Sequence, residues 1–183
     1  SDFESDSRYC IKWSTTYKKA CKIIYNKESE KKDYEKAEQL LIAEADSGNV
    51  LGVHDLGKLY STEKLGSKNE EKSFAYYNEA LQGFTEIEPN ADFMFPYENV
   101  YQKPVDMRSY IWYRIGKMHC YGLGTEQDYA QAFEWFLKSA KEGNKFAQYS
   151  LGNLYYYGNG VERDLSQAFL WYQKSSSQGQ PYA

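Results

Sequence analysis

The chain has 183 residues, and its 26 Asp and Glu side chains outnumber its 22 Lys and Arg side chains to give a formal net charge of −4. This balance argues against direct nucleic-acid binding, which usually needs a basic surface, and no apolar run reaches the roughly 20 residues of a membrane-spanning helix. The three cysteines, Cys10, Cys21 and Cys120, are an odd and scattered set. Because they do not make a disulfide framework, we expect a reducing, cytoplasmic compartment. The lack of a long apolar run predicts no association with a membrane.

The most informative feature is an internal repeat of 36 residues, because residues 151–164 align with residues 115–128 and both copies contain a Gly-x-Gly pair. Two earlier, degenerate copies align at the same phases. In chain order we expect the following segments: a flank at residues 1–11, helix pairs at about 12–48 and 49–84, an insertion at 85–107, helix pairs at about 108–143 and 144–180, and the start of a truncated fifth repeat at 181–183.

Each repeat is expected to form two helices. In the last copy the first helix carries Leu151, Leu154 and Tyr155 at a spacing that places them on one helical face. Gly152 interrupts this stripe, and we attribute it to the close approach of a neighbouring helix. The second helix should begin after a capping residue, because Asp and Asn side chains accept the first unpaired N–H groups. One shared phase holds such residues in all four copies: Asp33, Asn69, Asp128 and Asp164.

The glycine pair Gly158 and Gly160 has two interpretations. A Gly-x-Gly loop can cradle a phosphate, but phosphate-binding motifs place a strand before it and a further Gly or a Gly-Lys-Ser/Thr sequence where the helix opens. Neither is present in this sequence. Glycine ends a helix in a left-handed conformation without a steric clash. We therefore expect an ordinary turn between two helices.

The last copy carries the pattern Ala147-x-x-x-Leu151-Gly152-x-x-Tyr155-x-x-Gly158-x-Gly160-Val161-x-x-Asp164-x-x-x-Ala168-x-x-Trp171-Tyr172. This pattern resembles the Sel1-like repeat, a relative of the tetratricopeptide repeat, and the resemblance covers most of residues 12–183, although the first two copies lack the glycine pair. The resemblance implies an all-α fold, a right-handed α/α solenoid of four Sel1-like helix pairs with an aromatic-rich insertion in the second. It also implies a noncatalytic scaffold for protein–protein interaction.

Two alternatives remain open. An array with an aromatic insertion also resembles the C-terminal arms of bacterial mobilisation relaxases, which would make the chain an accessory array of a larger DNA-processing enzyme. Some bacterial Sel1 proteins are accessories of peptidoglycan or secretion systems, although the cysteines argue mildly against that reading. No Ser/His/Asp or Cys/His constellation can be argued, so we expect no catalytic residue, cofactor or metal site. His119 stands at a tyrosine phase of the repeat, which favours a packing role.

In tetratricopeptide-like arrays the first helices line the concave face, and the repeat phase gives the residues that we expect there. The resemblance implies that lysine and asparagine at such phases can bind an acidic peptide or a C-terminal carboxylate, and tyrosines add rigid contact area. Lysine is also the default residue of a solvated helix face, so an unspecific surface is the alternative. The candidates are Lys18, His54, Tyr113 and Tyr149, then Lys22, Lys58, Lys117 and Asn153, and, with less support, Tyr25, Ser61, Cys120 and Tyr156.

The insertion is the second candidate site. Four aromatic residues fall within nine positions, at Phe93, Phe95, Tyr97 and Tyr101. An insertion of this length is often functional or disordered, and its aromatic residues argue against disorder. We expect it to be either a lid that packs on the array or a partner-binding loop.

Overall fold

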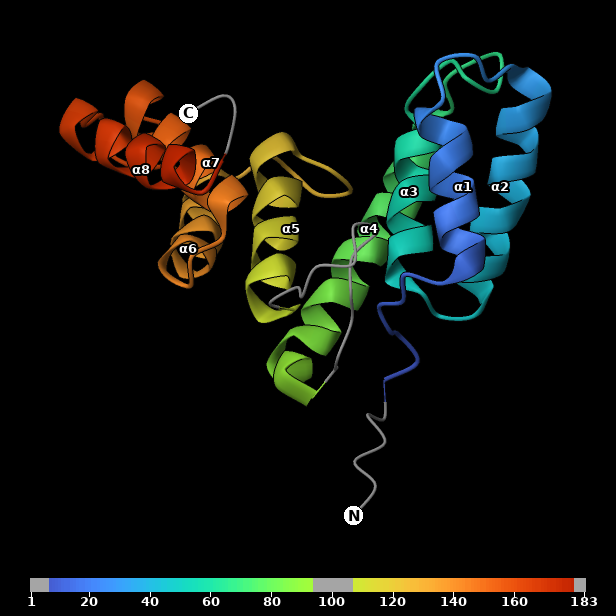
Figure 1. The fold of residues 1–183 in the computed structure, drawn as a ribbon, viewed down its shortest axis with the longest axis horizontal. Helices are drawn as coiled ribbons and strands as arrows, with labels where there is room; N and C mark the ends of the chain where they lie inside the picture. The colour runs from blue at the N-terminus through green and yellow to red at the C-terminus, as the bar shows by residue number, and fades with distance from the viewer. Residues whose placement is uncertain (1–6, 94–106, 180–183) are drawn as a thin grey trace. The chain divides into compact units, whose positions relative to one another are not determined.

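The computed structural model describes residues 7–93 and 107–179. Within these residues it contains eight α-helices, one 3-10 helix and no strand beyond an isolated bridge (Figure 1). The chain divides into two compact units, an N-terminal unit of Ser1–Val105 and a C-terminal unit of Asp106–Ala183. The predicted all-α architecture of helix pairs is confirmed.

The N-terminal unit contains the helices α1 (Thr15–Tyr25), α2 (Lys31–Asp46), α3 (Val50–Tyr60) and α4 (Glu70–Ile87), followed by the 3-10 helix η1 (Glu88–Phe93). Each helix packs on the next one in the chain. Leu41, Leu56 and Phe84 come from three of the four helices and are fully buried in the core. Helix α4 continues three residues into the segment that the sequence assigns to the insertion, and the end of the predicted array, residues 181–183, lies outside the described residues.

The N-terminal flank is docked on the first unit rather than set apart from it. Tyr9 is 4% exposed and Ile11 is fully buried. The Cys10 backbone N–H donates to Gly48 O over 2.9 Å, and the Val50 N–H donates to Cys10 O over 2.9 Å. These bonds attach the flank to the turn between α2 and α3. The sequence predicts a flank at this place but gives no sign of its docking.

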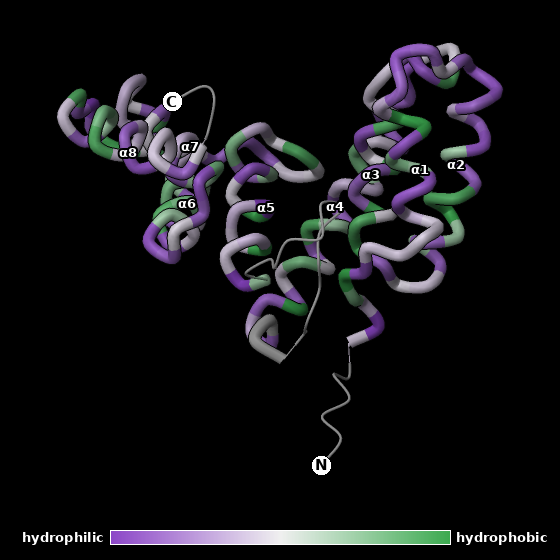
Figure 2. The backbone as a smooth tube through the Cα atoms, viewed as in Figure 1, coloured by the Kyte–Doolittle hydropathy of each residue, from purple (hydrophilic) through white to green (hydrophobic). Residues whose placement is uncertain are grey.

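The C-terminal unit contains α5 (Met107–Tyr121), α6 (Tyr129–Lys141), α7 (Lys145–Tyr157) and α8 (Leu165–Ser177), again with each helix packed on the next. Its core joins residues of successive helices, among them Phe136 of α6, Leu151 of α7 and Trp171 of α8. Tyr155, which the sequence places on one helical face with Leu151 and Leu154, packs against this cluster, and its ring meets that of Phe133 at 5.5 Å. In Figure 2 each helix carries both hydrophilic and hydrophobic residues, as expected of helices with one buried face.

Three of the four predicted helix caps are confirmed. Asn69, Asp128 and Asp164 each accept a hydrogen bond from the backbone N–H three residues on, at 3.0 Å. The prediction for Asp33 is wrong, because α2 begins earlier and its cap is Glu30. Asp33 lies in the first turn instead, where its carboxylate accepts the Glu30 N–H over 2.9 Å to form a capping box.

The glycines behave as the turn interpretation predicts. Gly158 ends α7 with a φ of 68°, and Gly160 follows with a φ of 72°, both in the left-handed region. Gly152 lies where α7 meets α8, and a Cβ added there would come within 2.6 Å of the Tyr172 ring. The close approach predicted for Gly152 is therefore confirmed.

Candidate functional site

A basic and aromatic surface lies along α1 in the N-terminal unit. It surrounds an open hollow of about 720 Å³, whose lining residues are Trp13, Thr15, Tyr17, Lys18, Lys19, Cys21, Lys22 and Tyr25. Two of the predicted site residues, Lys18 and Lys22, are among them. They lie one helical turn apart on α1, which is why they border the same hollow. We call Trp13, Lys18, Lys22, Tyr25 and Lys58 the lysine–tyrosine surface.

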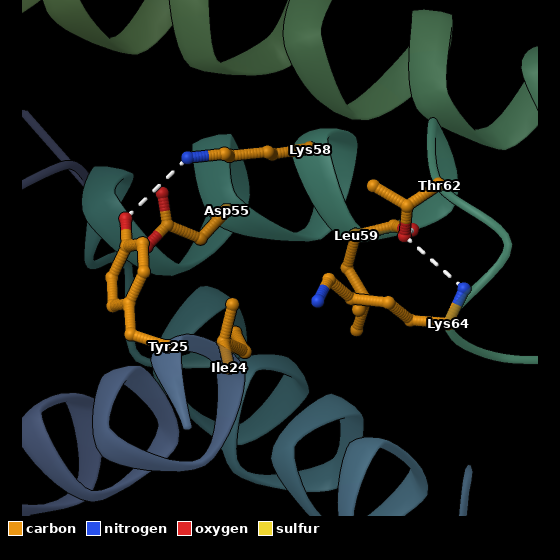
Figure 3. A pocket seen from close by; sticks show the side chains of 7 residues that line it. All are labelled: Ile24, Tyr25, Asp55, Lys58, Leu59, Thr62 and Lys64. Atoms are coloured by element: carbon orange, nitrogen blue, oxygen red, sulfur yellow. Dashed lines mark hydrogen bonds between the residues drawn. The ribbon is translucent and has the colours of Figure 1, made fainter. Parts of the chain in front are cut away.

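Lys58 of α3 joins this surface through Tyr25 (Figure 3). The Lys58 Nζ donates to the Tyr25 hydroxyl over 3.4 Å and lies 5.3 Å from the centroid of the Tyr25 ring. The Tyr25 side chain is 68% exposed. An exposed aromatic ring of α1 is thus in contact with a lysine of α3, the first helix of the next pair. The sequence predicts both helices at this surface but not the contact between them.

A second hollow of about 30 Å³, close to the size of one water molecule, lies beside Tyr25. Lys58 and Lys64 reach it from α3 and the following turn, and Asp55 lines it as well. The Lys64 Nζ donates to the hydroxyl of Tyr34 over 3.2 Å and lies 4.5 Å from its ring centroid. Lys64 is therefore held beside the lysine–tyrosine surface by an aromatic residue of α2.

In the described part of the chain, the lysines along α1 are not held in ion pairs. Among the residues that the structure describes, Lys18, Lys19 and Lys22 take part in no ion pair. The charge is local, because the whole chain carries a net charge of −4. A cluster of exposed ammonium groups raises the concentration of anionic groups near it and favours their binding at low ionic strength.

The prediction that His54 faces a partner is wrong for its side chain, which is 8% exposed. Its Nδ1 lies 2.9 Å from Asp55 Oδ1, and its ring meets the Tyr77 ring edge-on at 5.2 Å. Asp55 also accepts the Tyr17 hydroxyl over 2.6 Å. Helix α3 is packed between other helices and exposes only Lys58, so the phase that faces solvent in α1 is buried in α3.

The predicted residues of α5 lie together in the C-terminal unit. The Tyr113 ring lies 5.9 Å from the rings of both Phe136 and Phe146, and the Lys117 Nζ lies 5.7 Å from the Tyr113 ring. Burial raises the pKa of Tyr113 to about 12. Its phenol therefore stays neutral, as a hydrogen-bonding and aromatic group, throughout the ordinary pH range.

The predicted residues of α7 are engaged with α8 and with the turn that joins the two helices. Tyr172 donates its hydroxyl to Asn153 Oδ1 over 2.5 Å, and its ring lies 5.7 Å from that of Tyr149. The Tyr156 ring meets the Tyr157 ring edge-on at 4.9 Å, and Arg163 Nε donates to the Tyr156 carbonyl over 3.0 Å. This face is aromatic, in contrast to the lysine-rich face of α1.

The predicted insertion site is only partly described. Phe93 is the last residue of η1, while Phe95, Tyr97 and Tyr101 lie outside the described residues. Sequence reasoning missed Trp13, Lys19 and Lys64, which line the two hollows. Lys19 could have been predicted, because it follows the predicted site residue Lys18 in the sequence. Trp13 and Lys64 could not, because they lie outside the first-helix phases that the repeat defines.

No group of three or more His, Cys, Asp or Glu side chains that could hold a metal ion occurs within residues 7–93 and 107–179. His119 is half-buried, and burial lowers its pKa from the ordinary value. None of the helices described is long and apolar enough to cross a membrane.

Helices that pack pairwise along the chain, with the same turns and close contacts at matched phases, define an α/α solenoid repeat protein. The family model described as Sel1 repeat matches residues 51–83, 113–144 and 145–180, and the chain belongs to this family. Sel1 repeat proteins are generally scaffolds for protein interaction and are typically noncatalytic. The matches leave out residues 12–48, where α1 and α2 nevertheless form a helix pair.

Several solved structures are similar to this chain. A Sel1 repeat protein from Oxalobacter formigenes superposes with a TM-score of 0.52 at 23% identity, covering 77% of this chain and 90% of that one. The antigen c5321 of uropathogenic Escherichia coli superposes with a TM-score of 0.48 at 22% identity, covering 79% of this chain and 26% of that one. Helicobacter pylori cysteine rich protein B superposes with a TM-score of 0.43 at 17% identity, covering 86% of this chain and 96% of that one. A comparison with curated proteins gave no match.

Proposed function

We propose that this chain is a noncatalytic scaffold that binds an acidic segment, or the C-terminal carboxylate, of a protein partner on the lysine–tyrosine surface. The observation that carries the proposal is the hollow lined by Lys18, Lys22 and Tyr25, together with the contact of the Lys58 Nζ with the exposed Tyr25 ring. Ammonium groups that lack an internal counterion can pair with carboxylates without first losing a partner. The aromatic ring offers rigid contact area at a low cost in side-chain entropy.

The C-terminal unit contributes a second contact surface in this proposal, formed by Tyr113, Lys117, Tyr149, Asn153 and Tyr156. Because Asn153 already accepts a hydrogen bond through Oδ1, the group that it offers to a partner is its amide N–H₂, a donor suited to a carboxylate. The neighbouring tyrosines supply apolar contact and hydroxyl groups. We expect this surface to add contact area rather than charge attraction.

The test uses Lys22→Glu combined with Lys58→Glu. The probe is a short peptide of Asp and Glu residues with a free C-terminal carboxylate, and its binding is followed by amide chemical shifts in NMR spectra. Each exposed charge pair contributes about 0.2–1 kcal/mol, and reversal replaces attraction with repulsion, so the double variant should bind about tenfold or more weakly at low ionic strength.

Lys68→Glu combined with Lys72→Glu is the matched control, since both are exposed lysines of the same unit and the double substitution changes the charge equally. We expect the control to keep nearly the full affinity and the wild-type affinity to fall as salt is added. Equal losses for the two charge reversals would show an unspecific charge effect. Unchanged binding by the double variant would overturn the proposal.

A further inference from the structure

Trp13 stands at a repeat phase where two other first helices have an asparagine cap. In the alignment of the repeats it corresponds to Asn49 and Asn144. Each of these asparagines caps its helix, because its side chain accepts a backbone N–H of the first turn. In the first pair Ser14 has this role instead and accepts the Tyr17 N–H over 3.0 Å. The start of α1 therefore does not require a tryptophan at this place.

Buried polar side chains hold the chain on both sides of Trp13. The fully buried Asn49 accepts the Lys12 N–H over 3.2 Å and donates its amide to Lys12 O over 2.8 Å. The Ser14 hydroxyl donates to the carboxylate of Glu44, a buried residue, over 2.7 Å. The backbone of Trp13 is therefore fixed before any ligand arrives. A contact that is already ordered in this way loses little further entropy on binding.

The hollow of about 720 Å³ runs along α1 from Trp13, which lies just before the helix, to Tyr25, its last residue. Its volume is within the range of ligand sites, which is roughly 300–1,000 Å³. From Thr15 to Tyr25 the helix rises about 15 Å, since each residue adds about 1.5 Å. An extended peptide covers that length with about five residues. The hollow therefore fits a short extended segment.

The hollow offers two kinds of contact at different places along α1. Trp13 is partly exposed and contributes an indole ring before the helix begins. Lys18 and Lys22 contribute ammonium groups further along, and neither is in an ion pair with a described residue. An aromatic ring packed on an indole gains more than its buried apolar area alone. The complementary ligand therefore has carboxylates and an aromatic side chain at separate places along its length.

We propose that Trp13 determines which acidic segment binds, and that the partner segment is an extended stretch of about five residues with an aromatic side chain at one end. The aromatic side chain packs on Trp13, and the carboxylates of the segment pair with Lys18 and Lys22. This inference rests on the proposed function, because it adds a second requirement to the acidic segment that the lysines bind. Charge alone would accept any acidic segment, whereas Trp13 selects among them.

The test compares the affinities of matched peptides for the full chain by NMR titration of the α1 amides. Each peptide has about five residues, all Asp or Glu except one terminal residue, which is either Ala or Phe. The variable residue is placed first in one pair of peptides and last in the other, so both chain directions are covered. In one direction the Phe peptide should bind about tenfold more tightly than the Ala peptide. Nuclear Overhauser effects between its ring protons and the Trp13 indole should report the contact directly.

Two sets of variants separate the aromatic contact from the charge attraction. Trp13→Ala should reduce the tenfold ratio between the Phe and Ala peptides to near one, and Trp13→Phe should keep most of it. Lys22→Glu combined with Lys58→Glu should weaken both peptides and leave their ratio unchanged. Trp135→Ala is the matched control, since Trp135 is a partly exposed tryptophan of the other unit, and it should keep the full ratio.

The outcomes distinguish this inference from the proposed function. Equal affinities of the Phe and Ala peptides for the wild-type chain would overturn the inference and leave acidic-segment binding intact. A ratio that survives Trp13→Ala would also overturn it, because the aromatic contact would then lie elsewhere. Phenylacetate bound as tightly as the Phe peptide would overturn it in favour of a site for small aromatic acids. If neither peptide binds, both the inference and the proposed function fail.

Discussion

The substitution Gly116→Ala tests whether close helix contact, rather than helix propensity, governs this position. An added Cβ would lie 2.6 Å from Phe136 Cδ1 and 2.7 Å from Cε1, and Phe136 is only 1% exposed. Normal carbon contacts are about 3.5–4.0 Å, so the ring or the helix must move by about 1 Å. Overpacking of this kind costs about 1–3 kcal/mol, and the gain in helix propensity offsets about 1 kcal/mol. We expect a net loss of up to about 2 kcal/mol.

Urea unfolding followed by circular dichroism measures this change, and Phe136→Leu provides the control background. In that background the added methyl group meets a smaller side chain, so Gly116→Ala should cost less by about 1 kcal/mol or more in a double-mutant cycle. Stabilisation by Gly116→Ala in the wild-type background would refute the reasoning. So would an equal cost in both backgrounds.

Two further predictions concern a buried carboxylate and a histidine. Glu44→Ala removes the acceptor of the Ser14 hydroxyl (2.7 Å) and of the Asn49 amide (2.6 Å), so we expect a loss of about 1–3 kcal/mol in urea unfolding and faster hydrogen exchange in the docked flank; unchanged exchange would contradict this role. Burial lowers the pKa of His119, and the Asp128 carboxylate opposes this shift in part. As the pH falls, the unfolded chain therefore binds a proton at His119 before the folded chain does. The contribution of neutral His119 to folding stability is complete above pH about 6.5, and it is lost as the pH falls through the folded pKa. Urea unfolding at several pH values should show a smaller acid-side loss for His119→Gln, and an identical pH profile would argue against it.

The framework of the repeat could be predicted from sequence because its signals are local. A glycine that ends a helix, an Asp or Asn cap and an apolar stripe each act within a few residues, and the 36-residue shift shows them twice. Gly158 and Asp164 accordingly have the predicted roles. Asp33 was the exception, because Glu30 three residues earlier competes with it for the cap and the two form one capping box.

The candidate surface could be predicted only in part, because exposure depends on how many neighbours a helix has. Lys18 and His54 share one repeat phase, yet Lys18 lines an open hollow while His54 is buried against α4. The phase gives the direction of a side chain relative to its own pair. It does not give the residues that come from other pairs, such as the contact of Lys58 with Tyr25.

The glycine contacts show how the framework and the variable surface are separated within one repeat. Gly57, Gly116 and Gly152 each lie against an aromatic ring of the second helix in their pair, and the rings belong to Tyr77, Phe136 and Tyr172. In the first pair the two phases hold Cys21 and Leu41 instead. A side chain replaces the glycine in the one pair where the facing residue is not a ring, so the two positions change together, as close packing requires.

The phases that carry the proposed binding residues show no such pairing. One of these phases holds Lys18, His54, Tyr113 and Tyr149 in the four pairs. Lys18 lines an open hollow, whereas His54 contacts two buried rings of α4. Tyr113 contacts two phenylalanines, and Tyr149 contacts Tyr172. Packing within the repeat therefore does not dictate the residue at this phase. That freedom allows one unit to present a lysine and the other tyrosines on the same framework, and the proposed partner binding rests on this variation.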